Sequence, residues 1–246
     1  TEHAFEENYV RVDVPERNGK KVAVIGAGPA GLATAIHLNL KGYTVTVYDK
    51  NENAGGLLRY GIPNFKLNKD IIDRRLNILK QEGITFKFGE NIDSTKLPTG
   101  YDAYVIATGT PVARDLNIPG RENKGVYLAL ELLSQQNRVL AGSEFKKDEL
   151  VNAKGKDVLV IGGGDTGNDC IATAIRQGAA DVKQLEITRR PPSKRPADNP
   201  WPQWPRVAKT GYGQEEANEL FEGVLTQYET TAVGFEGVDG HVSSVT

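Results

Sequence analysis

Two glycine-rich segments of the same design constrain the fold of this chain more than any other feature. The first, GAGPAG at 26–31, follows the apolar run 22–25 and precedes apolar residues at helical spacing that stop at Gly42. The second, GGGDTG at 162–167, lies between the apolar run 158–161 and another helical pattern that ends near Gly178. In a strand–turn–helix unit, such glycines allow a tight turn and close approach of the backbone to a pyrophosphate, which the helix N-terminus binds. The sequence therefore predicts two dinucleotide-binding units.

The charged residues that follow the next strand differ between the two units. In the first unit the β-rich stretch 43–48 ends in Asp49, whereas in the second the stretch 182–188 ends in Arg189 and Arg190. A carboxylate accepts hydrogen bonds from ribose hydroxyls and repels a 2′-phosphate, while guanidinium groups bind phosphate in a bidentate way. The first site is therefore predicted to hold FAD or NAD and the second to prefer NADP(H). The alternative for the arginines is a solvated charge pair in a loop.

The remaining pattern predicts α/β architecture with doubly wound parallel sheets. Helices are expected from Asn68, as N-cap, to Gly83, over 128–140 with Leu130 and Leu133 buried, and over 214–221. Strands are expected at 84–88, at 104–109 as a buried strand, at 224–235 and at 242–246, with an Asp-Gly hairpin between the last two. The proline- and glycine-bearing stretch 110–125 is the expected boundary. The predicted domains are an N-terminal arm (1–19), a first unit (20–112) and a second unit (113–246).

Composition excludes several classes of function. A formal net charge of −2 gives no reason to expect a nucleic acid or an anionic membrane as partner. No apolar stretch approaches the roughly 20 residues that span a bilayer, and the N-terminus lacks the regions of a secretory signal, so a cytoplasmic location is expected. The single cysteine excludes an internal disulfide and an iron–sulfur cluster held by this chain's thiolates alone. Three histidines without ligand spacing predict no metal site.

Several chemistry-bearing residues are ambiguous. Cys170, on the inner face of the second helical pattern, is expected to be a core residue and not a redox thiol. Asp165 is either a structural cap or a ligand contact. Residues 191–205 hold both tryptophans and a high density of proline, so they are expected to form a loop. Trp201 and Trp204 would either cover a cofactor or only pin that loop. No catalytic side chain is expected, because dinucleotide cofactors carry the hydride chemistry themselves.

Several longer stretches carry a resemblance to a known family. They are VAVIGAGPAGL (22–32), GGLLRYGIPNFKL (55–67), VIATGT (105–110), VLVIGGGDTGNDC (158–170), QLEITRRPP (184–192) and DNPWPQWP (198–205). In these the chain resembles the small (β) subunits of NADPH-dependent glutamate synthase and their relatives. The resemblance implies an FAD domain, formed here by 20–112, into which an NADPH domain is inserted.

The resemblance also implies residues that contact the cofactors. For the FAD these are Gly26, Gly28, Pro29, Ala30 and Gly31 at the pyrophosphate, Asp49 at the ribose, Gly56, Leu57, Arg59 and Ile62 toward the flavin, and Thr108 and Gly109 nearby. For NADPH they are Gly163, Gly164, Asp165, Thr166 and Gly167 at the pyrophosphate, with Arg189 and Arg190 at the 2′-phosphate. These assignments follow the family's motifs position by position.

The function that the resemblance implies is electron input. Hydride would pass from NADPH to FAD, and electrons would continue through [4Fe–4S] clusters to a large (α) subunit that makes glutamate from glutamine and 2-oxoglutarate. The family's cysteine-rich N-terminal domain and the returning half of its FAD domain have no counterpart here. The chain is therefore expected to be a fragment that binds no cluster itself and is inactive alone.

Two other functions remain open at this stage. Related NAD(P)H–flavin subunits serve ferredoxin–NADP transhydrogenases, pyrimidine reductases and sulfide-linked reductases, and the sequence hardly separates these. In a different class, the chain would be a nucleotide-binding or docking module without redox turnover. The missing half of the flavin site favours that alternative, whereas the apolar GGLLRYGIP loop favours a bound isoalloxazine ring.

Overall fold

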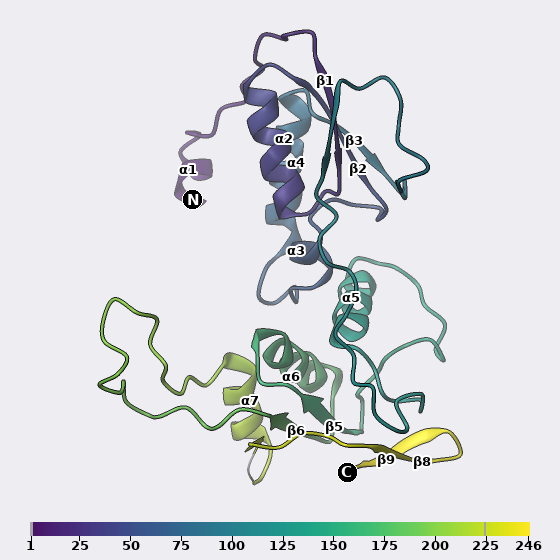
Figure 1. The fold of residues 1–246 in the computed structure, drawn as a ribbon, viewed down its shortest axis with the longest axis vertical. Helices are drawn as coiled ribbons and strands as arrows, with labels where there is room; N and C mark the ends of the chain where they lie inside the picture. The colour runs from purple at the N-terminus through teal and green to yellow at the C-terminus, as the bar shows by residue number, and fades with distance from the viewer. Residues whose placement is uncertain (1, 224) are drawn as a thin grey trace. The chain divides into compact units, whose positions relative to one another are not determined.

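The computed structural model describes residues 2–223 and 225–246 of the chain. The chain divides into two compact units, Thr1–Ala113 and Arg114–Thr246 (Figure 1). The predicted boundary between residues 112 and 113 lies beside this division, within the stretch expected to link the domains. Each unit has its own sheet and its own core, so each is described by itself.

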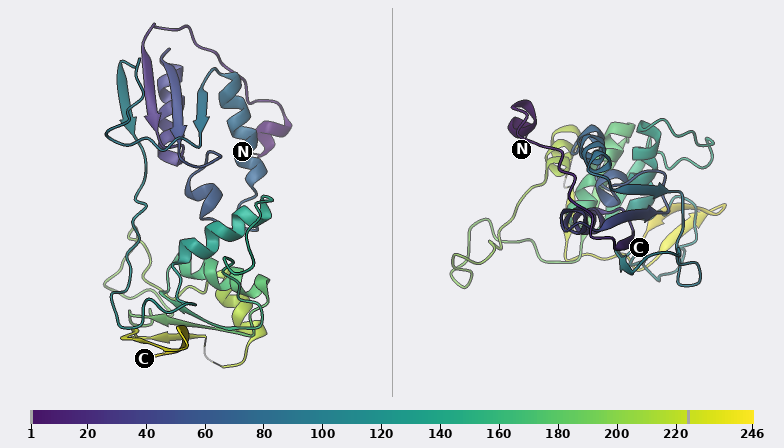
Figure 2. Two further views of the ribbon diagram at one scale, coloured as in Figure 1. Left: turned by 90° about the vertical axis from the view of Figure 1, so that its right-hand side faces the viewer. Right: turned by 90° about the horizontal axis from the view of Figure 1, so that it is seen from above.

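Unit 1 is a parallel sheet with helices packed on it. Its elements in chain order are α1 (Glu2–Glu6), β1 (Lys21–Ile25), α2 (Pro29–Leu40), β2 (Thr44–Asp49), α3 (Leu57–Tyr60), α4 (Lys69–Gln81), β3 (Thr85–Phe88) and β4 (Ala103–Ile106). The strand order is β3-β2-β1-β4, and every pairing is parallel. Figures 1 and 2 show α2 and α4 beside each other along the sheet.

The core of unit 1 follows from the alternation of its strands. Val24, Val45 and Val47 are fully buried, and they pack with the buried Leu76 and Leu79 of α4. This packing leaves the opposite side chains of the strands on the other face of the sheet. The predicted cap of α4 is confirmed, since the Asn68 side chain accepts a hydrogen bond from the backbone N–H of Asp70 at 3.0 Å.

Unit 2 repeats the arrangement with a smaller sheet. Its elements are α5 (Ala129–Leu140), β5 (Asp157–Ile161), α6 (Asp165–Gln177), β6 (Asp181–Glu186), α7 (Tyr212–Leu220), β7 (Thr226–Tyr228), β8 (Phe235–Val238) and β9 (His241–Val245). The parallel sheet has the order β5-β6-β7, and β8 and β9 form a separate antiparallel hairpin. Asp239 and Gly240 turn the hairpin with φ of 52° and 74°, as an Asp-Gly turn requires. The prediction of two parallel α/β units is confirmed.

Three expectations about single elements are wrong. The strand expected to be buried at 104–109 is β4, which ends at Ile106 and forms an edge of the described sheet, so Ile106 is 65% exposed. Leu133 is buried, but Leu130 lies on the outer side of α5 and is exposed. The strand expected at 224–235 is shorter and divided: β7 ends at Tyr228, before Glu229 takes a positive φ of 54°, and Phe235 begins β8. Residue 224 lies outside the described part.

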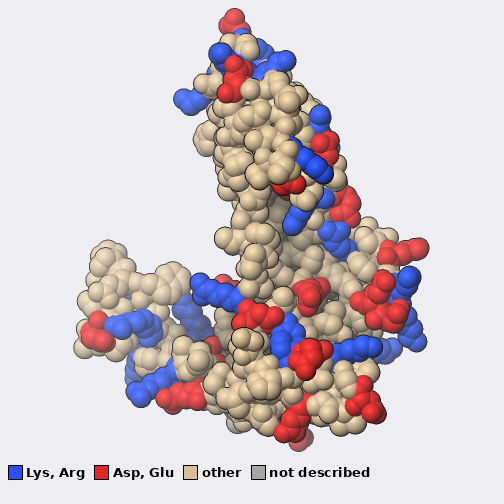
Figure 3. All heavy atoms as spheres, turned by 45° about the vertical axis from the view of Figure 1, so that its right-hand side comes forward, with Lys and Arg blue, Asp and Glu red and all other residues tan. Residues whose placement is uncertain are grey.

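Two segments expected to be irregular contain short helices. The N-terminal arm begins with α1, whose Glu2 forms an ion pair with Arg74 of α4. The glycine-rich loop at 51–63 contains α3, a single turn. Lysines and arginines lie among aspartates and glutamates over the face shown in Figure 3, in keeping with a net charge near zero. Among the described helices, none combines the length and the apolar character needed to cross a membrane.

Candidate functional site

The two glycine-rich turns adopt the same backbone conformation. Gly26 has a φ of 107° and Gly162 a φ of 117°, a region that favours glycine. A Cβ on Gly31 would overlap the carbonyl oxygen of Gly26, and a Cβ on Gly167 would overlap that of Gly162. The first and last glycines of each motif are therefore required by the turn, independently of any ligand.

Both turns end at a helix N-terminus that is open to an anion. Gly28 and Gly164 are the N-caps of α2 and α6, with φ/ψ of −74°/−178° and −77°/−179°. In the described structure, neither helix receives a side-chain cap hydrogen bond at this end. The first N–H groups of each helix therefore remain available to a pyrophosphate, which fits a dinucleotide at both positions.

The residues predicted at each pyrophosphate lie in these first helical turns. Pro29 begins α2, where its missing N–H is not needed, and Ala30 follows it. Asp165 begins α6 and Thr166 follows it. Gly164 is the N-cap, so of the two alternatives for Asp165 the structural cap does not hold, and the ligand contact stays a prediction. Its carboxylate instead adds a favourable charge at the helix N-terminus.

Asp49 is tied to the first glycine turn. Its Oδ2 accepts from the backbone N–H of Ala27 at 2.7 Å, and its Oδ1 accepts from the backbone N–H of Asn51 at 2.8 Å. The residues directly before this pair are also bonded: the N–H of Gly26 donates to the carbonyl of Tyr48 at 2.7 Å. The side-chain Nδ2 of Asn51 also donates to Oδ1 at 2.9 Å, so the half-buried carboxylate lies beside the turn and keeps a lone pair on Oδ2 for a further donor.

Unit 2 has an equivalent carboxylate that the sequence analysis missed. Leu185 pairs with Ile161 as Tyr48 pairs with Ile25, and the N–H of Gly162 donates to the carbonyl of Leu185 at 2.9 Å. Glu186 follows and ends β6 as Asp49 ends β2. Because the strand was expected to run through Thr188 to the arginines, Glu186 was taken as an ordinary strand residue. Its spacing from the last glycine of the motif, nearly that of Asp49, is the signal that could have found it.

The Glu186 carboxylate is held by backbone donors. The N–H of Thr188 donates to its Oε1 at 2.8 Å, and the N–H of Gly163 also donates to the carboxylate. Hydrogen bonding from Thr188, with further donation from Gly163 and Ile187, holds the pKa of Glu186 below its ordinary value. The group is therefore ionised at neutral pH and fixed beside the second turn.

The predicted arginine pair lies in the exposed loop after β6. Arg189 donates through Nε to Oε1 of Glu229 at 3.1 Å, and both side chains are largely exposed. Arg190 is exposed as well. Arg189 therefore already has a carboxylate partner at the end of β7, so its charge is partly compensated within the chain.

The apolar loop predicted to face a flavin is docked on the first glycine turn. The N–H of Gly55 donates to the carbonyl of Ala27 at 2.8 Å. A Cβ on Gly56 would lie only 2.8 Å from the Cα of Gly28, so the loop at Gly56 packs directly on the turn and leaves no room for a side chain there. Leu57 on α3 is exposed, whereas Ile62 is partly buried. The structure thus brings this loop to the turn where the first dinucleotide is predicted.

Arg59 has a structural role in the same loop. Its Nε donates to the carbonyl of Ala54 at 2.6 Å, and its guanidinium forms an ion pair with Asp73 of α4. Thr108 and Gly109, the other residues predicted near the flavin, follow β4 and are exposed. They lie at the same carboxyl ends of the strands as the first turn, because the N–H of Ala107 donates to the carbonyl of Ile25 at 2.7 Å.

Lys69 closes the end of the apolar loop and makes the free energy of unfolding depend on pH. Its ammonium group donates to the carbonyls of Ile62 and Leu67 at 2.7 and 2.9 Å. Burial, followed by the charge of Arg59, lowers the pKa of Lys69 from 10.5 to about 8. Between these values the unfolded chain binds more protons at this group than the folded chain, so the free energy of unfolding rises with pH.

Lys69→Met removes this titration. Between pH 7.5 and pH 9.5 the free energy of unfolding of the wild type is expected to rise by up to about 1 kcal/mol more than that of Lys69→Met. The rise is small because solvent screens the charge of this partly buried group. Urea denaturation at both pH values measures the difference, and Lys80→Met on the exposed side of α4 controls for the loss of a lysine. A gap between wild type and Lys69→Met that does not change with pH would contradict the assignment.

The proline-rich loop is ordered by Asn199 and not by its tryptophans. Asn199 is buried, its Nδ2 donates to the carbonyl of Trp204 at 3.1 Å, and its Oδ1 accepts from the N–H of Arg206 at 2.7 Å. Trp201 and Trp204 are 83% and 79% exposed, and Lys209 lies over the Trp204 ring at 4.4 Å. Of the two alternatives for these rings, pinning the loop does not hold, because exposed rings bury little surface, and covering a cofactor stays a prediction.

Cys170 is buried in unit 2, as expected for a core residue. Burial, followed by the charge of Asp169, raises the pKa of the thiol to about 12. We expect a thiol reagent such as dithionitrobenzoate at pH 8 to titrate no thiol in the folded chain and one in guanidinium chloride. Cys170→Ala supplies the blank. Rapid titration of the folded chain would contradict a buried thiol.

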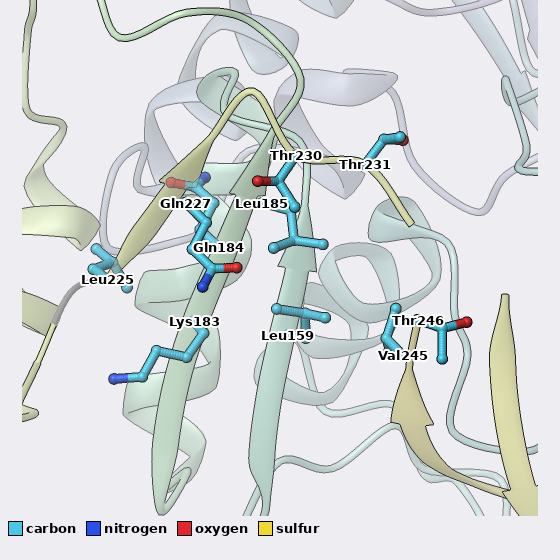
Figure 4. Close-up of a pocket in the computed structure, with 10 residues that line it drawn as sticks. All are labelled: Leu159, Lys183, Gln184, Leu185, Leu225, Gln227, Thr230, Thr231, Val245 and Thr246. Atoms are coloured by element: carbon cyan, nitrogen blue, oxygen red, sulfur yellow. The ribbon is translucent and has the colours of Figure 1, made fainter. Parts of the chain in front are cut away.

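A hollow of about 340 Å³ lies on the open face of the second sheet (Figure 4). Leu159, Lys183 and Leu185 line it from β5 and β6, and Val245 and Thr246 line it from the C-terminal strand. These sheet residues alternate with Val158, Val160 and Val182, which pack toward α6. The hollow is thus on the sheet face opposite α6, and none of its lining residues belongs to the glycine turn.

Comparisons with known proteins agree with this geometry. The family described as pyridine nucleotide-disulphide oxidoreductase matches the chain over residues 20–204. Over 98% of its own length the chain is 44% identical to Glutamate synthase [NADH] of Schizosaccharomyces pombe. Over 88% of its own length it is 46% identical to Glutamate synthase [NADPH] small chain of Bacillus subtilis. These alignments span 12% and 45% of the two relatives, so the chain corresponds to less than half of either.

A solved structure shares the fold. Mycobacterium tuberculosis FprA, in a complex with NADPH, aligns with a TM-score of 0.66 and 18% identity over 92% of this chain and 62% of its own. At that identity the likeness concerns the fold alone. It agrees with two parallel α/β units arranged in this order along one chain.

Proposed function

The chain belongs to the pyridine nucleotide-disulphide oxidoreductase family, and we propose that it is the electron-input flavoprotein segment of a glutamate synthase. Unit 1 would bind FAD and unit 2 a nicotinamide nucleotide, NADPH by the sequence prediction. Hydride would pass to the flavin, and electrons would leave through [4Fe–4S] clusters held outside this chain. A large subunit or region would use them to make glutamate from glutamine and 2-oxoglutarate.

The observation that carries this proposal is the pair of glycine turns with one conformation and different surroundings. Each turn presents uncapped helix N–H groups and an acceptor carboxylate at the end of the second strand, which suits the pyrophosphate and ribose of a dinucleotide. Only the first turn, among the described residues, carries the docked apolar loop with Gly56 and Leu57. An apolar cover suits an isoalloxazine ring, so the flavin is assigned to unit 1.

In this proposal the chain's residues bind and orient the cofactors. The flavin, when bound, accepts hydride and releases electrons singly. Asp49 would accept from the ribose hydroxyls of FAD, and the N–H groups of α2 would hold its pyrophosphate. Lys69 would keep the apolar loop closed by holding the carbonyls of Ile62 and Leu67. The N–H groups of the first turn of α6, which begins at Asp165, would hold the pyrophosphate of the nicotinamide nucleotide, while the N–H of Gly163 holds Glu186.

The names of the relatives do not decide which nicotinamide nucleotide is used. The yeast relative is named for NADH and the bacterial one for NADPH, at nearly the same identity to this chain. The choice therefore depends on the side chains around the second turn. The predicted preference for NADPH rests on Arg189 and Arg190.

The visible absorption spectrum of the purified chain, after incubation with FAD and removal of excess, tests the proposal. Uptake of a flavin band is the expected result for the chain alone, and bleaching of that band on anaerobic addition of NADPH or NADH would show that hydride transfer takes place in it as well. Binding of a nicotinamide nucleotide, measured separately by calorimetry, tests unit 2 without requiring turnover. A chain that takes up neither FAD nor a nicotinamide nucleotide would overturn the proposal. A colourless chain that still binds the nucleotide would support a binding module.

A further inference from the structure

Gln184 is a fully buried amide at a position where unit 1 has an apolar side chain. Val160 pairs with Gln184 in the second sheet as Val24 pairs with Val47 in the first, and Val160 and Val24 precede their glycine turns by the same spacing. Gln184 and Val47 are both fully buried. Because a buried amide costs free energy unless it forms hydrogen bonds, the partners of Gln184 indicate what it does in unit 2.

The amide of Gln184 holds the first peptide of the second glycine turn. Its Nε2 donates to the carbonyl of Gly162 at 2.9 Å, and a Cβ on Gly167 would lie only 3.3 Å from the same nitrogen. The Gly162 carbonyl shares a planar peptide with the N–H of Gly163, which donates to the Glu186 carboxylate. Two side chains of β6 therefore hold this peptide from its two sides.

A chain of hydrogen bonds from the start of α7 sets the orientation of the Gln184 amide. The backbone N–H of Gly211 donates to Oε1 of Gln214 at 2.8 Å, so Nε2 of Gln214 is the atom that donates to Oε1 of Gln184, at 2.7 Å. The hydroxyl of Thr226 donates to the same oxygen at 3.0 Å. A backbone N–H can only donate and a carbonyl can only accept, so the chain from Gly211 to Gly162 has one consistent arrangement. It directs the nitrogen of Gln184 to the turn.

The sequence of the second turn makes such a contact important. Residues 162–164 are three consecutive glycines, whereas the first turn contains Ala27 and Pro29. Glycine populates more backbone conformations than any other residue, and proline fixes φ, so the second turn is less restricted by its own sequence than the first. Val47, the counterpart of Gln184 in unit 1, has no donor with which to hold a carbonyl.

From these contacts we propose that Gln184 is a positioning residue for the nicotinamide nucleotide. By fixing the peptide after Gly162, it sets the direction in which the uncapped N–H groups of α6 meet the pyrophosphate. Donors that are fixed before the ligand arrives bind it without a further cost of ordering. The inference rests on the proposed function, which assigns this nucleotide to unit 2. Because NAD+ and NADP+ share the pyrophosphate, Gln184 is expected to affect both equally, unlike Arg189 and Arg190.

Calorimetric titration of Gln184→Met with NAD+ and with NADP+ tests this role without turnover. Methionine keeps the length of the side chain but removes the amide. We expect both nucleotides to bind about tenfold more weakly, the effect of losing one hydrogen bond to a charged group, and the ratio of their affinities to stay unchanged. Titration well below the melting temperature of each variant keeps the chain folded, so a loss of stability alone does not lower the affinity.

A second substitution covers the case in which Gln184→Met does not fold. Gln184→Val introduces the residue that unit 1 carries at the equivalent strand position, where it is buried without strain on the sheet pairing. It also removes the donor to Gly162, so the same weakening of both nucleotides is expected. Circular dichroism shows whether each variant is folded.

Gln177→Met is the matched control. This half-buried glutamine lies at the other end of α6, where its amide accepts from the N–H of Ala153 at 2.9 Å and donates to Gln136 at 2.7 Å. Its replacement is expected to lower the melting temperature and to leave both nucleotide affinities unchanged. Uptake of FAD, assigned to unit 1, is expected to be the same in all these variants.

The possible outcomes separate this inference from the proposed function. Unchanged affinity for both nucleotides in a folded Gln184 variant would overturn the positioning role, and so would a loss confined to NADP+. An equal loss in Gln177→Met would also overturn it, because affinity would then follow stability and not the contact with Gly162. Failure of the wild type to bind either nucleotide would instead contradict the proposed nucleotide site itself.

Discussion

Gly26→Ala is expected to abolish FAD binding and to lower the free energy of unfolding of unit 1 by about 3–5 kcal/mol. The φ of 107° strains any residue with a Cβ, which by itself costs about 1–2 kcal/mol. The added Cβ would also overlap the carbonyl oxygen of Ala107. That carbonyl cannot easily retreat, because the N–H of Ala107 donates to Ile25 and the N–H of Gly26 donates to Tyr48, both at 2.7 Å.

Gly162→Ala is the matched control within the same molecule. Its φ of 117° imposes the same strain, but no described atom outside its own neighbours lies within 4 Å of the added Cβ. We therefore expect a loss of only about 1–2 kcal/mol in unit 2. Urea denaturation followed by circular dichroism, with flavin retention after gel filtration, measures both variants. Equal losses would show that backbone strain alone, and not contact with Ala107, makes Gly26 necessary.

The difference between these two glycines comes from the sheets around them. In unit 1, β4 pairs with β1 and places Ala107 against the turn. In the described part of unit 2, β5 pairs with β6 alone, so the corresponding side of the second turn is open. The two motifs look alike in sequence, and only the strand order shows that they are held differently.

The local elements could be predicted from the sequence because short-range chemistry determines them. The glycine spacing predicted both turns, Asn68 predicted the cap of α4, and Asp239-Gly240 predicted the hairpin. Ile72, Leu76 and Leu79 fall on one face at helical spacing, and all three are buried. Each of these signals lies within a few residues of the feature that it predicts.

Features that depend on neighbours distant in sequence were harder to predict. Whether Ile106 is buried depends on the strand order, and the apolar run around it gives no sign that β4 is an edge. Leu130 and Leu133 are both apolar, yet only Leu133 faces the core of unit 2. Glu186 was missed because the end of β6 is set by its pairing with β7 and the turn at Glu229, which no local pattern reveals.

The candidate site shows the same limit. The sequence predicts which residues surround each turn but gives no sign of the hydrogen bonds and ion pairs that their polar groups already form. Arg59 was predicted to face the flavin, and the structure binds its guanidinium to Ala54 and Asp73. Arg189 was predicted as a free phosphate ligand, and it is paired with Glu229. Such pairs form between segments far apart along the chain, so their effect on binding can be argued only from the fold.

Replacement of both arginines, Arg189→Ala with Arg190→Ala, is expected to weaken NADP+ binding by about 30- to 100-fold and NAD+ binding by less than about threefold. A charge-assisted contact with a 2′-phosphate contributes about 1.5–3 kcal/mol, and NAD+ has no phosphate at that position. Because Arg189 is partly compensated by Glu229, the single change Arg190→Ala is expected to have the larger effect of the two. Calorimetric titration of NADP+ and NAD+ measures both.

The matched control removes two positive charges elsewhere in unit 2. Arg114→Ala with Lys146→Ala alters the net charge by the same amount, and the exposed Lys146 lies apart from β6 in the loop after α5. A similar loss of NADP+ affinity in this control would mean that the arginines act only through the overall field, which salt screens. Equal weakening of NADP+ and NAD+ in the Arg189 and Arg190 double variant would show that the pair is a solvated loop charge and contacts no 2′-phosphate.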